Sequence, residues 1–342
     1  MRIALDAMGG DSGVAEVVAG AARYSRSPGA HLVLVGQRDA IASVLALHSH
    51  DPSRIEVVHS PQFVPMEADA RAALDSMPEA SINLAARLVA EGDADALVSA
   101  GHTAATILAT SRRLQRLEGI RRAALAAVYP TQQLHGSRQD PFGLMLDVGA
   151  TVGASAEELV GFAVMGSAYS RIISENARPS VALLSNGSEA NRGTPEIVDA
   201  HRLLLHHPSL HFVGNVEGLD IARGTADVVV CNGFIGNIVL KMLEGFYEVA
   251  VHLARDASHS SLLWKVGLMM LQDGIQQIRS VTDWRQYGGA PLLGFNRVVI
   301  KAHGRSNARA VRNALKVAER AVAGKLVQQI AAGMATPSVP PA

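Results

Sequence analysis

Short apolar runs alternate with longer amphipathic stretches along most of the chain. Alanine-rich stretches such as Ser81–Glu91 have the three- and four-residue apolar spacing of helices. Runs that are apolar on both faces are typical of parallel strands covered by helices on both sides. The pattern therefore predicts a three-layer α/β/α fold with a mostly parallel sheet. Its strands are expected at residues 3–5, 31–35, 55–58, 96–98, 144–148, 181–184, 210–213 and 228–231.

The last regular pattern predicts a single helix packed on the core. Apolar residues recur at three- and four-residue spacing from Ala308 to Ala331. Beyond it, proline and small residues cannot form a packed element. We expect one α/β domain over residues 1–332, with a helical protrusion at about residues 245–285. Residues 333–342 are expected to be a disordered tail.

Charge and cysteine content narrow the class of protein. The 342 residues carry 31 basic and 31 acidic side chains, so net charge offers no argument for nucleic-acid binding. The one cysteine, Cys231, lies in an apolar run and is expected to be a buried, reduced thiol, which fits the cytoplasm. The first 20 residues contain three carboxylates and do not resemble a signal peptide. No apolar stretch has the length of a membrane span.

Small and polar residues follow the predicted strands. In parallel sheets, ligands bind beyond the carboxyl ends of the strands, so these loops are expected to form a common site. Glycine allows the backbone to approach an anion closely. The loops in question are residues 6–11, 99–103, 147–150, 185–187, 214–215 and 232–237.

Several kinds of catalysis lack their usual motifs. No predicted strand is followed by the dinucleotide or P-loop glycine pattern, and no nucleophile elbow is present. The histidines are scattered, so neither a metal nor a cofactor is expected. Glycine-rich loops that lead into helices can bind phosphate through backbone N–H groups. Lys241, four residues after Asn237, is either a phosphate contact or a solvated helix lysine.

The order of the motifs resembles the bacterial phosphate acyltransferases, which convert acyl-acyl-carrier-protein and inorganic phosphate into acyl phosphate. The resemblance covers residues 1–330. Each motif is weak alone, but their order and spacing together are specific. The motifs lie at residues 6–11, 98–101, 147–150, 165–167, 214–218, 228–237, 240–241, 287–294 and 299–304.

The resemblance implies a homodimeric α/β enzyme with a fold related to phosphotransacetylases and isopropylmalate dehydrogenases. Its acyl phosphate product feeds phospholipid synthesis. Dianionic phosphate attacks a thioester without a strong base, so the site must mainly hold the two reactants together. Donors aimed at the developing oxyanion supply further acceleration.

The resemblance also implies roles for individual residues. Asn237 is the candidate donor to phosphate or oxyanion, and Arg192 stands where the family usually has a lysine. Asp6 begins the floor of the site, and the loop at residues 99–103 is expected to contact an anion or a carbonyl. The further substrate-binding candidates are Gly9, Gly10, Asp11, Ser99, Gly101, His102, Thr103, Asn232, Gly236 and Lys241.

Some site loops depart from the family pattern. Asn232 and Ile235 replace an aspartate and a threonine, and His102 replaces an asparagine. Thr151 stands where asparagine is usual, and residues 75–81 are acidic where relatives are basic. The alternatives are an acyltransferase with shifted substrate preference, a catalytically weak protein that binds the carrier or acyl chains, and drift at positions outside catalysis. A small-acyl phosphotransacetylase is a further enzyme alternative.

One segment, Ser260–Leu271, is too apolar for a solvated helix and too short to span a bilayer. The family sits peripherally on the membrane and dimerises through helices in this region, so the resemblance implies a membrane contact here. A dimer helix or core helix is the competing interpretation. The residues expected at the membrane are Leu262, Leu263, Trp264, Val266, Met269 and Met270.

Overall fold

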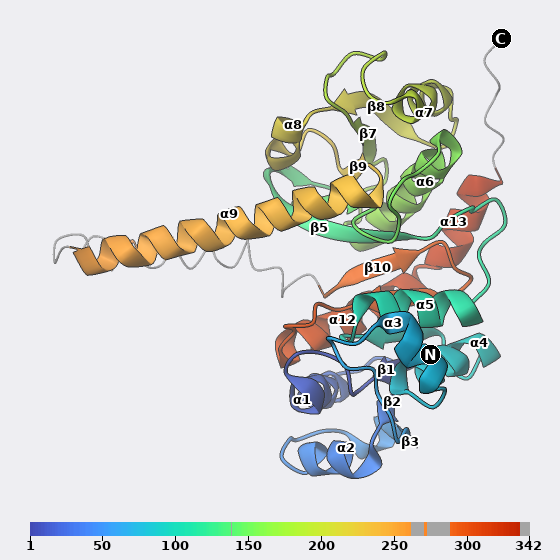
Figure 1. The fold of residues 1–342 in the computed structure, drawn as a ribbon, viewed down its shortest axis with the longest axis vertical. Coiled ribbons are helices and arrows are strands. Elements are labelled where there is room, and N and C mark those ends of the chain that lie inside the picture. Colours follow the sequence, from blue (N-terminus) through green and yellow to red (C-terminus); the bar gives the residue numbers. More distant parts are fainter. Residues whose placement is uncertain (138, 261–269, 272–287, 336–342) are drawn as a thin grey trace.

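An eleven-stranded sheet forms the centre of the molecule (Figure 1). The computed structural model describes residues 1–137, 139–260, 270–271 and 288–335. The strand order is β3-β2-β1-β4-β11-β10-β5-β6-β9-β7-β8. Neighbouring strands are parallel except at β11–β10, β10–β5 and β5–β6, so the prediction of a mostly parallel sheet is confirmed.

The three antiparallel pairings divide the sheet into two parallel groups on either side of β10 (Figure 1). All eight predicted strands are present, whereas β5, β10 and β11 had no prediction. The first group is β1 (Arg2–Asp6), β2 (His31–Gly36), β3 (Ile55–His59), β4 (Ala96–Ser99) and β11 (Val298–Lys301). The joining strands are β10 (Ala290–Leu293) and β5 (Ala124–His135). The second group is β6 (Asp140–Leu146), β9 (Val228–Val230), β7 (Ser180–Leu184) and β8 (His211–Val216).

Helices cover both faces of the sheet and enclose two apolar cores. The first core is covered by α1 (Gly13–Ser25), α2 (Arg38–Leu45), α6 (Ala156–Ile173), α7 (Pro195–Leu205), α12 (Ala308–Ala323) and α13 (Leu326–Met334). The second is covered by α3 (Ala70–Ser76), α4 (Ser81–Glu91), α5 (Thr103–Arg113), α8 (Gly218–Arg223) and α9 (Gly233–Ser260). A short 3-10 helix, η1 (Pro52–Arg54), precedes β3.

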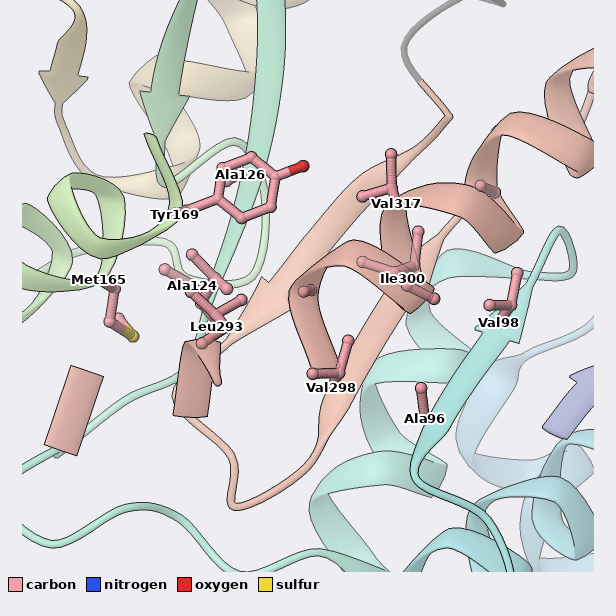
Figure 2. Close-up of a cluster of buried hydrophobic side chains, with 14 of the residues drawn as sticks. Ala96, Val98, Ala124, Ala126, Met165, Tyr169, Leu293, Val298, Ile300 and Val317 are labelled. Carbon is pink, nitrogen blue, oxygen red and sulfur yellow. The ribbon is translucent and has the colours of Figure 1, made fainter. Parts of the chain in front are cut away.

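Alternation along each strand supplies both cores. Ile3 and Leu5 of β1 point into the first core, while Ala4 points into the second. In the first core, Ile300 of β11 shares a cluster with Val98 of the neighbouring strand and Val317 of α12 (Figure 2). Because each face of a strand meets apolar side chains, these strands are continuous apolar runs in the sequence.

The prediction of a single helix over Ala308–Ala331 is wrong, because the structure has two helices there, α12 and α13, separated by Gly324 and Lys325. A Cβ at Gly324 would lie 2.5 Å from Cγ2 of Ile172, so close packing against α6 requires glycine here. The next residue, Lys325, has a φ of 56°, which ends the regular helix. The spacing of apolar residues continues unchanged from α12 into α13, so the sequence pattern does not reveal where the helix ends.

Helix α9 extends well beyond the rest of the molecule (Figure 1). Its 28 residues span about 42 Å at the usual rise of an α-helix. Five of the residues expected at a membrane (262, 263, 264, 266 and 269) lie outside the described residues, whereas Met270 is 83% exposed. Within the described part of the chain, no helix combines the length and apolarity needed to cross a bilayer.

Candidate active site

Asp6, the last residue of β1, organises the first group of loops from a buried position. Ser81 Oγ donates to its Oδ1 over 2.7 Å, and Ser99 Oγ donates to its Oδ2 over 2.7 Å. Burial raises the pKa of Asp6, while these hydrogen bonds lower it. Because both oxygens already accept hydrogen bonds, this carboxylate joins β1 to α4 and β4.

Lys301 lies at the end of β11, opposite Ser99 in the sheet register. Its side chain is buried, and Nζ donates to the carbonyl oxygen of Ala302. Burial lowers the pKa of Lys301 to about 8, whereas the charges of Asp6 and Asp11 raise it. Asp6, Ser81, Ser99 and Lys301 form what we call the first cluster. A buried amine therefore adjoins the buried carboxylate at its centre.

Two glycines bring the loops of the first cluster together. A Cβ at Gly9 would lie 2.4 Å from the Cα of Gly101, so neither backbone can approach the other with a side chain between them. The N–H of Gly101 donates to Ser99 Oγ over 3.0 Å. His102 Nδ1 accepts from the N–H of Ala105 over 3.2 Å and so caps α5. Several groups expected to contact a ligand thus also fix the loop.

The second group of loops is organised by Asp147, which is fully buried after β6. Its carboxylate accepts from four backbone N–H groups: Leu125 at 2.9 Å, Gly149 at 3.1 Å, Ala150 at 3.0 Å and Thr151 at 2.7 Å. Such a shell of donors satisfies a buried carboxylate without a cation. These hydrogen bonds wrap the loop at residues 147–151 around the carboxylate.

Two of the unusual residues connect this loop to the start of α9. Thr151 Oγ1 accepts from the N–H of Gly233 over 3.1 Å. Asn232 Oδ1 accepts from the N–H of Ile235 over 2.9 Å and caps the helix. Asparagine and aspartate both perform this capping role. The loss of a carboxylate at position 232 therefore leaves the helix N-terminus intact.

Asn237 follows on the first turns of α9 and is exposed. A Cβ built on Gly149 would lie 3.8 Å from Oδ1 of Asn237, so the amide faces the loop at residues 147–151. Gly236, one residue earlier, packs against Asp147. Asp147, Thr151, Asn232, Gly236 and Asn237 form what we call the second cluster.

The segment 302–306 lies between the loop after β1 and helix α9. On one side, the N–H of Asp11 donates to the carbonyl oxygen of Gly304 over 2.8 Å. On the other, Nη1 of Arg305 lies 3.6 Å from Oε1 of Glu248 on α9. Burial lowers the pKa of His303, and the charge of Glu244 on α9 opposes this effect. The segment thus contacts the loop after β1 and one face of α9.

The two basic candidates lie outside the clusters. Arg192, on the loop between β7 and α7, is largely exposed and its Nε is 3.4 Å from Oε2 of Glu189. Nζ of Lys241 is 2.7 Å from Oε2 of Glu244. Both cations are paired with carboxylates on the surface, where such pairs are weak. Each remains available to an anion that competes with its partner.

Ser81, Asp147 and Lys301 make the buried contacts of these loops but were not among the predicted site residues, although residues 147–150 and 299–304 lie in the expected motifs. The sequence does hold one signal for Lys301, which ends the apolar run Val298–Lys301. Because an unpaired ammonium is costly to bury, a lysine in a buried strand indicates a nearby polar or acidic partner. Among the described residues, no group of three or more His, Cys, Asp or Glu side chains is placed to hold a metal ion.

The whole chain is similar to a family of known enzymes. The family model described as fatty acid synthesis protein matches residues 1–329. The phosphate acyltransferase of Heliobacterium modesticaldum is 41% identical over 331 residues, which cover 96% of each chain. This chain belongs to the phosphate acyltransferase family. The phosphate acyltransferase of Synechocystis sp. is 39% identical, covering 94% of this chain and 90% of that relative. The family resemblance of the motifs is confirmed.

Solved structures agree with the fold of this phosphate acyltransferase family member. A phosphotransacetylase from Streptococcus pyogenes superposes with a TM-score of 0.64 at 18% identity, covering 96% of this chain and 94% of that chain. The EutD phosphotransacetylase from Staphylococcus aureus gives a TM-score of 0.60 at 16% identity, with 94% and 93% covered. The expected relation to the phosphotransacetylase fold is therefore confirmed.

Proposed function

We propose that this member of the phosphate acyltransferase family moves a fatty acyl group from acyl-acyl-carrier-protein to inorganic phosphate. The acyl phosphate product then enters phospholipid synthesis. The observation that carries the proposal is the 41% identity to a phosphate acyltransferase over 96% of both chains. The two clusters support it, because in each of them buried hydrogen bonds hold loops at the carboxyl ends of strands, as a site that positions reactants requires.

The proposed reaction is a single acyl transfer. A phosphate oxygen attacks the thioester carbonyl carbon and forms a C–O bond, and the C–S bond then breaks. The acyl group leaves as acyl phosphate, while the carrier thiolate takes a proton from solvent. Phosphate is substantially dianionic near neutral pH, and a thiol with a pKa of about 8.5 is a good leaving group. The enzyme must therefore orient the reactants and stabilise the oxyanion more than it must move protons.

Asn237 is the proposed donor to the oxyanion or phosphate, since its exposed amide stands at the edge of the second cluster. Lys241 and Arg192 are proposed to attract phosphate when they leave their carboxylate partners. Gly9, Gly10 and Asp11 line the proposed floor beside Gly101. Asp6 acts there as a positioning residue, because its oxygens accept from two serines.

The altered loop residues support retained activity. His102 caps α5, Asn232 caps α9, and Thr151 ties the loop at residues 147–151 to α9. Each of these three residues makes a hydrogen bond that fixes a loop or a helix start. The acidic segment 75–81 has its own partner, because Asp75 lies 2.8 Å from Arg112. These contacts favour the acyltransferase over a protein that only binds the carrier.

The test is a direct assay with purified protein, acyl-carrier thioester and phosphate, in which hydroxylamine traps acyl phosphate as hydroxamate. We expect hydroxamate to accumulate only when phosphate is present. Carrier binding without product would replace the proposal with a binding protein. Turnover of acetyl-coenzyme A in preference to long-chain acyl carrier would replace it with a small-acyl phosphotransacetylase.

We further propose a cytoplasmic homodimer that touches the membrane peripherally. An apolar stripe on α9 supports the dimer: Phe246, Val249 and Leu253 are 67%, 56% and 63% exposed and lie at three- and four-residue spacing. The membrane contact is proposed for six apolar residues that follow α9 in the sequence, Leu262, Leu263, Trp264, Val266, Met269 and Met270. Vesicle flotation of a variant with charges in that segment tests it, with loss of flotation by an intact dimer as the expected result.

A further inference from the structure

A cavity of about 220 Å³ lies behind the second cluster. It is bounded by the segment before α6, by the ends of β7 and β9, and by the starts of α7 and α9. An engineered apolar cavity of about 150 Å³ is sufficient to bind benzene. This cavity therefore has room for a chain of several carbon atoms.

The lining is mainly apolar. Leu159, Leu183, Ile197 and Ile235 contribute branched side chains from four different elements. Cys231 adds its thiol, and burial raises the pKa of that thiol, so it remains neutral. An apolar cavity of this kind gains stability when an apolar ligand replaces empty space or weakly held water.

The charges at the rim argue against an anion as the occupant. Glu196 is the one ionised side chain among the described residues that line the cavity. A hydrogen bond from Thr194 lowers the pKa of Glu196, so the carboxylate is charged at neutral pH. A phosphate group would meet this carboxylate with no lining cation to offset it.

The cavity shares two residues with the start of α9, close in sequence to Asn237. Asn232 and Ile235 both line it, and they are joined by the hydrogen bond that caps α9. Gly236 and Asn237 follow on the same helical turn and face the loop at residues 147–151. An acyl chain with its carbonyl near Asn237 therefore has an apolar space within one helical turn.

We propose that this cavity takes up the apolar end of the acyl chain and so sets the chain length that the protein prefers. This inference rests on the proposed acyl transfer to phosphate. Ile235 is part of the wall, where the family pattern has a threonine. Its larger apolar side chain makes the wall less polar and limits the length of chain that fits.

The test fills the cavity from one wall. Ala154→Phe adds an aromatic ring at a lining position, whereas Val152→Phe, two residues earlier, adds the same ring at a site that is 81% exposed. We expect Ala154→Phe to lower kcat/KM for dodecanoyl carrier thioester by about tenfold or more and to change that for butanoyl thioester by less than about threefold. Val152→Phe should leave the ratio of the two values unchanged.

Direct binding separates this inference from the proposed reaction. Calorimetric titration with dodecanoate should give weaker binding to Ala154→Phe than to Val152→Phe, whether or not either variant turns over. No turnover of any thioester, with this binding difference intact, overturns acyl transfer and leaves the cavity assignment standing. The cavity assignment is overturned if the two variants have the same ratio of dodecanoyl to butanoyl kcat/KM and bind dodecanoate equally well. If Ala154→Phe does not fold, Ile197→Phe fills the opposite wall and is judged by the same two measurements.

Discussion

The carbonyl oxygen of Asp147 lies 1.9 Å from the position that a Cβ would take at Gly236. No side chain fits at this contact, and neither partner can yield easily, because both are backbone groups. The start of α9 therefore packs directly on the loop that Asp147 organises. This contact determines where Asn237 lies, since Asn237 follows one residue later.

Replacing Gly236 with alanine should separate α9 from that loop. We expect Gly236→Ala to lower the free energy of unfolding by about 1–3 kcal/mol, the usual cost of overpacking, and to reduce acyl transfer. Gly245→Ala is the matched control on the same helix, since a Cβ at Gly245 would meet no atom within 4 Å. That variant should be stabilised by about 0.5–1 kcal/mol. Urea unfolding of both proteins measures the difference, and equal effects would contradict the packing argument.

The Asp147 carboxylate should be intolerant of its amide analogue. Asp147→Asn retains one oxygen and turns an NH₂ group toward backbone N–H donors, so at least one donor loses its acceptor. We expect the free energy of unfolding to fall by about 2–4 kcal/mol. Thermal and urea unfolding measure this loss. A variant as stable as the parent would mean that the four N–H groups do not depend on the charge.

Lys301 predicts a specific pH dependence of stability. Its pKa is about 8 in the folded protein, below the 10.5 of an ordinary lysine. At pH values between these two, the unfolded chain holds more protons than the folded one, so raising the pH stabilises the fold. Relative to Lys301→Met, the free energy of unfolding should rise by about 1 kcal/mol per pH unit from about pH 8 to about pH 10. Urea unfolding of both proteins across this range checks the slope, and a constant difference would rule out a buried amine with a lowered pKa.

Asn237 should act on rate more than on stability. Its side chain is exposed, so Asn237→Ala should leave the free energy of unfolding within about 0.5 kcal/mol. If the amide donates to the oxyanion, kcat should fall about 10²–10³-fold. The KM for the carrier thioester should change little. Steady-state hydroxamate assays measure both constants, and an unchanged kcat would remove Asn237 from the proposed mechanism.

The stripe on α9 makes a prediction about assembly. Leu253→Glu places a charge on the proposed dimer face and should weaken dimerisation by about thirtyfold or more. His252→Glu adds a carboxylate one residue away, on a side chain that is 71% exposed and lies off the stripe. Light scattering over a range of concentrations distinguishes the two. If both variants dissociate to the same extent, or if neither does, the stripe on α9 is not the dimer interface.

The parallel strands were predictable because they are buried on both faces. Ile3, Ala4 and Leu5 alternate between two cores, and each core demands an apolar residue. β5 was not predictable in this way, since its run from Ala124 to His135 is apolar only at its start and contains Pro130. Pairing of distant segments brings it into the sheet, and local pattern does not carry that information.

The glycine loops were predictable for a similar physical reason, since Gly9, Gly101 and Gly236 each permit a close approach between backbones. The partners of those loops were not. Ser81 donates to Asp6 across 75 residues of chain, and the charge of Lys301, from near the other end of the chain, lowers the pKa of the same carboxyl group. A serine at the start of a helix and a lysine at the end of a strand are both common for local reasons. Neither residue therefore indicates in the sequence that it acts on Asp6.

The four residues of β10 link the two halves of the sheet. Within the sheet, Ala290 and Pro291 pair with β11, and Leu292 and Leu293 pair with β5, while α6 packs on α12 and α13 beside this joint. The chain enters β10 after the segment that follows α9, and α9 itself starts at the second cluster. The proposed donor Asn237 and the strand that joins the two halves of the sheet therefore belong to one continuous stretch of chain, residues 237–293.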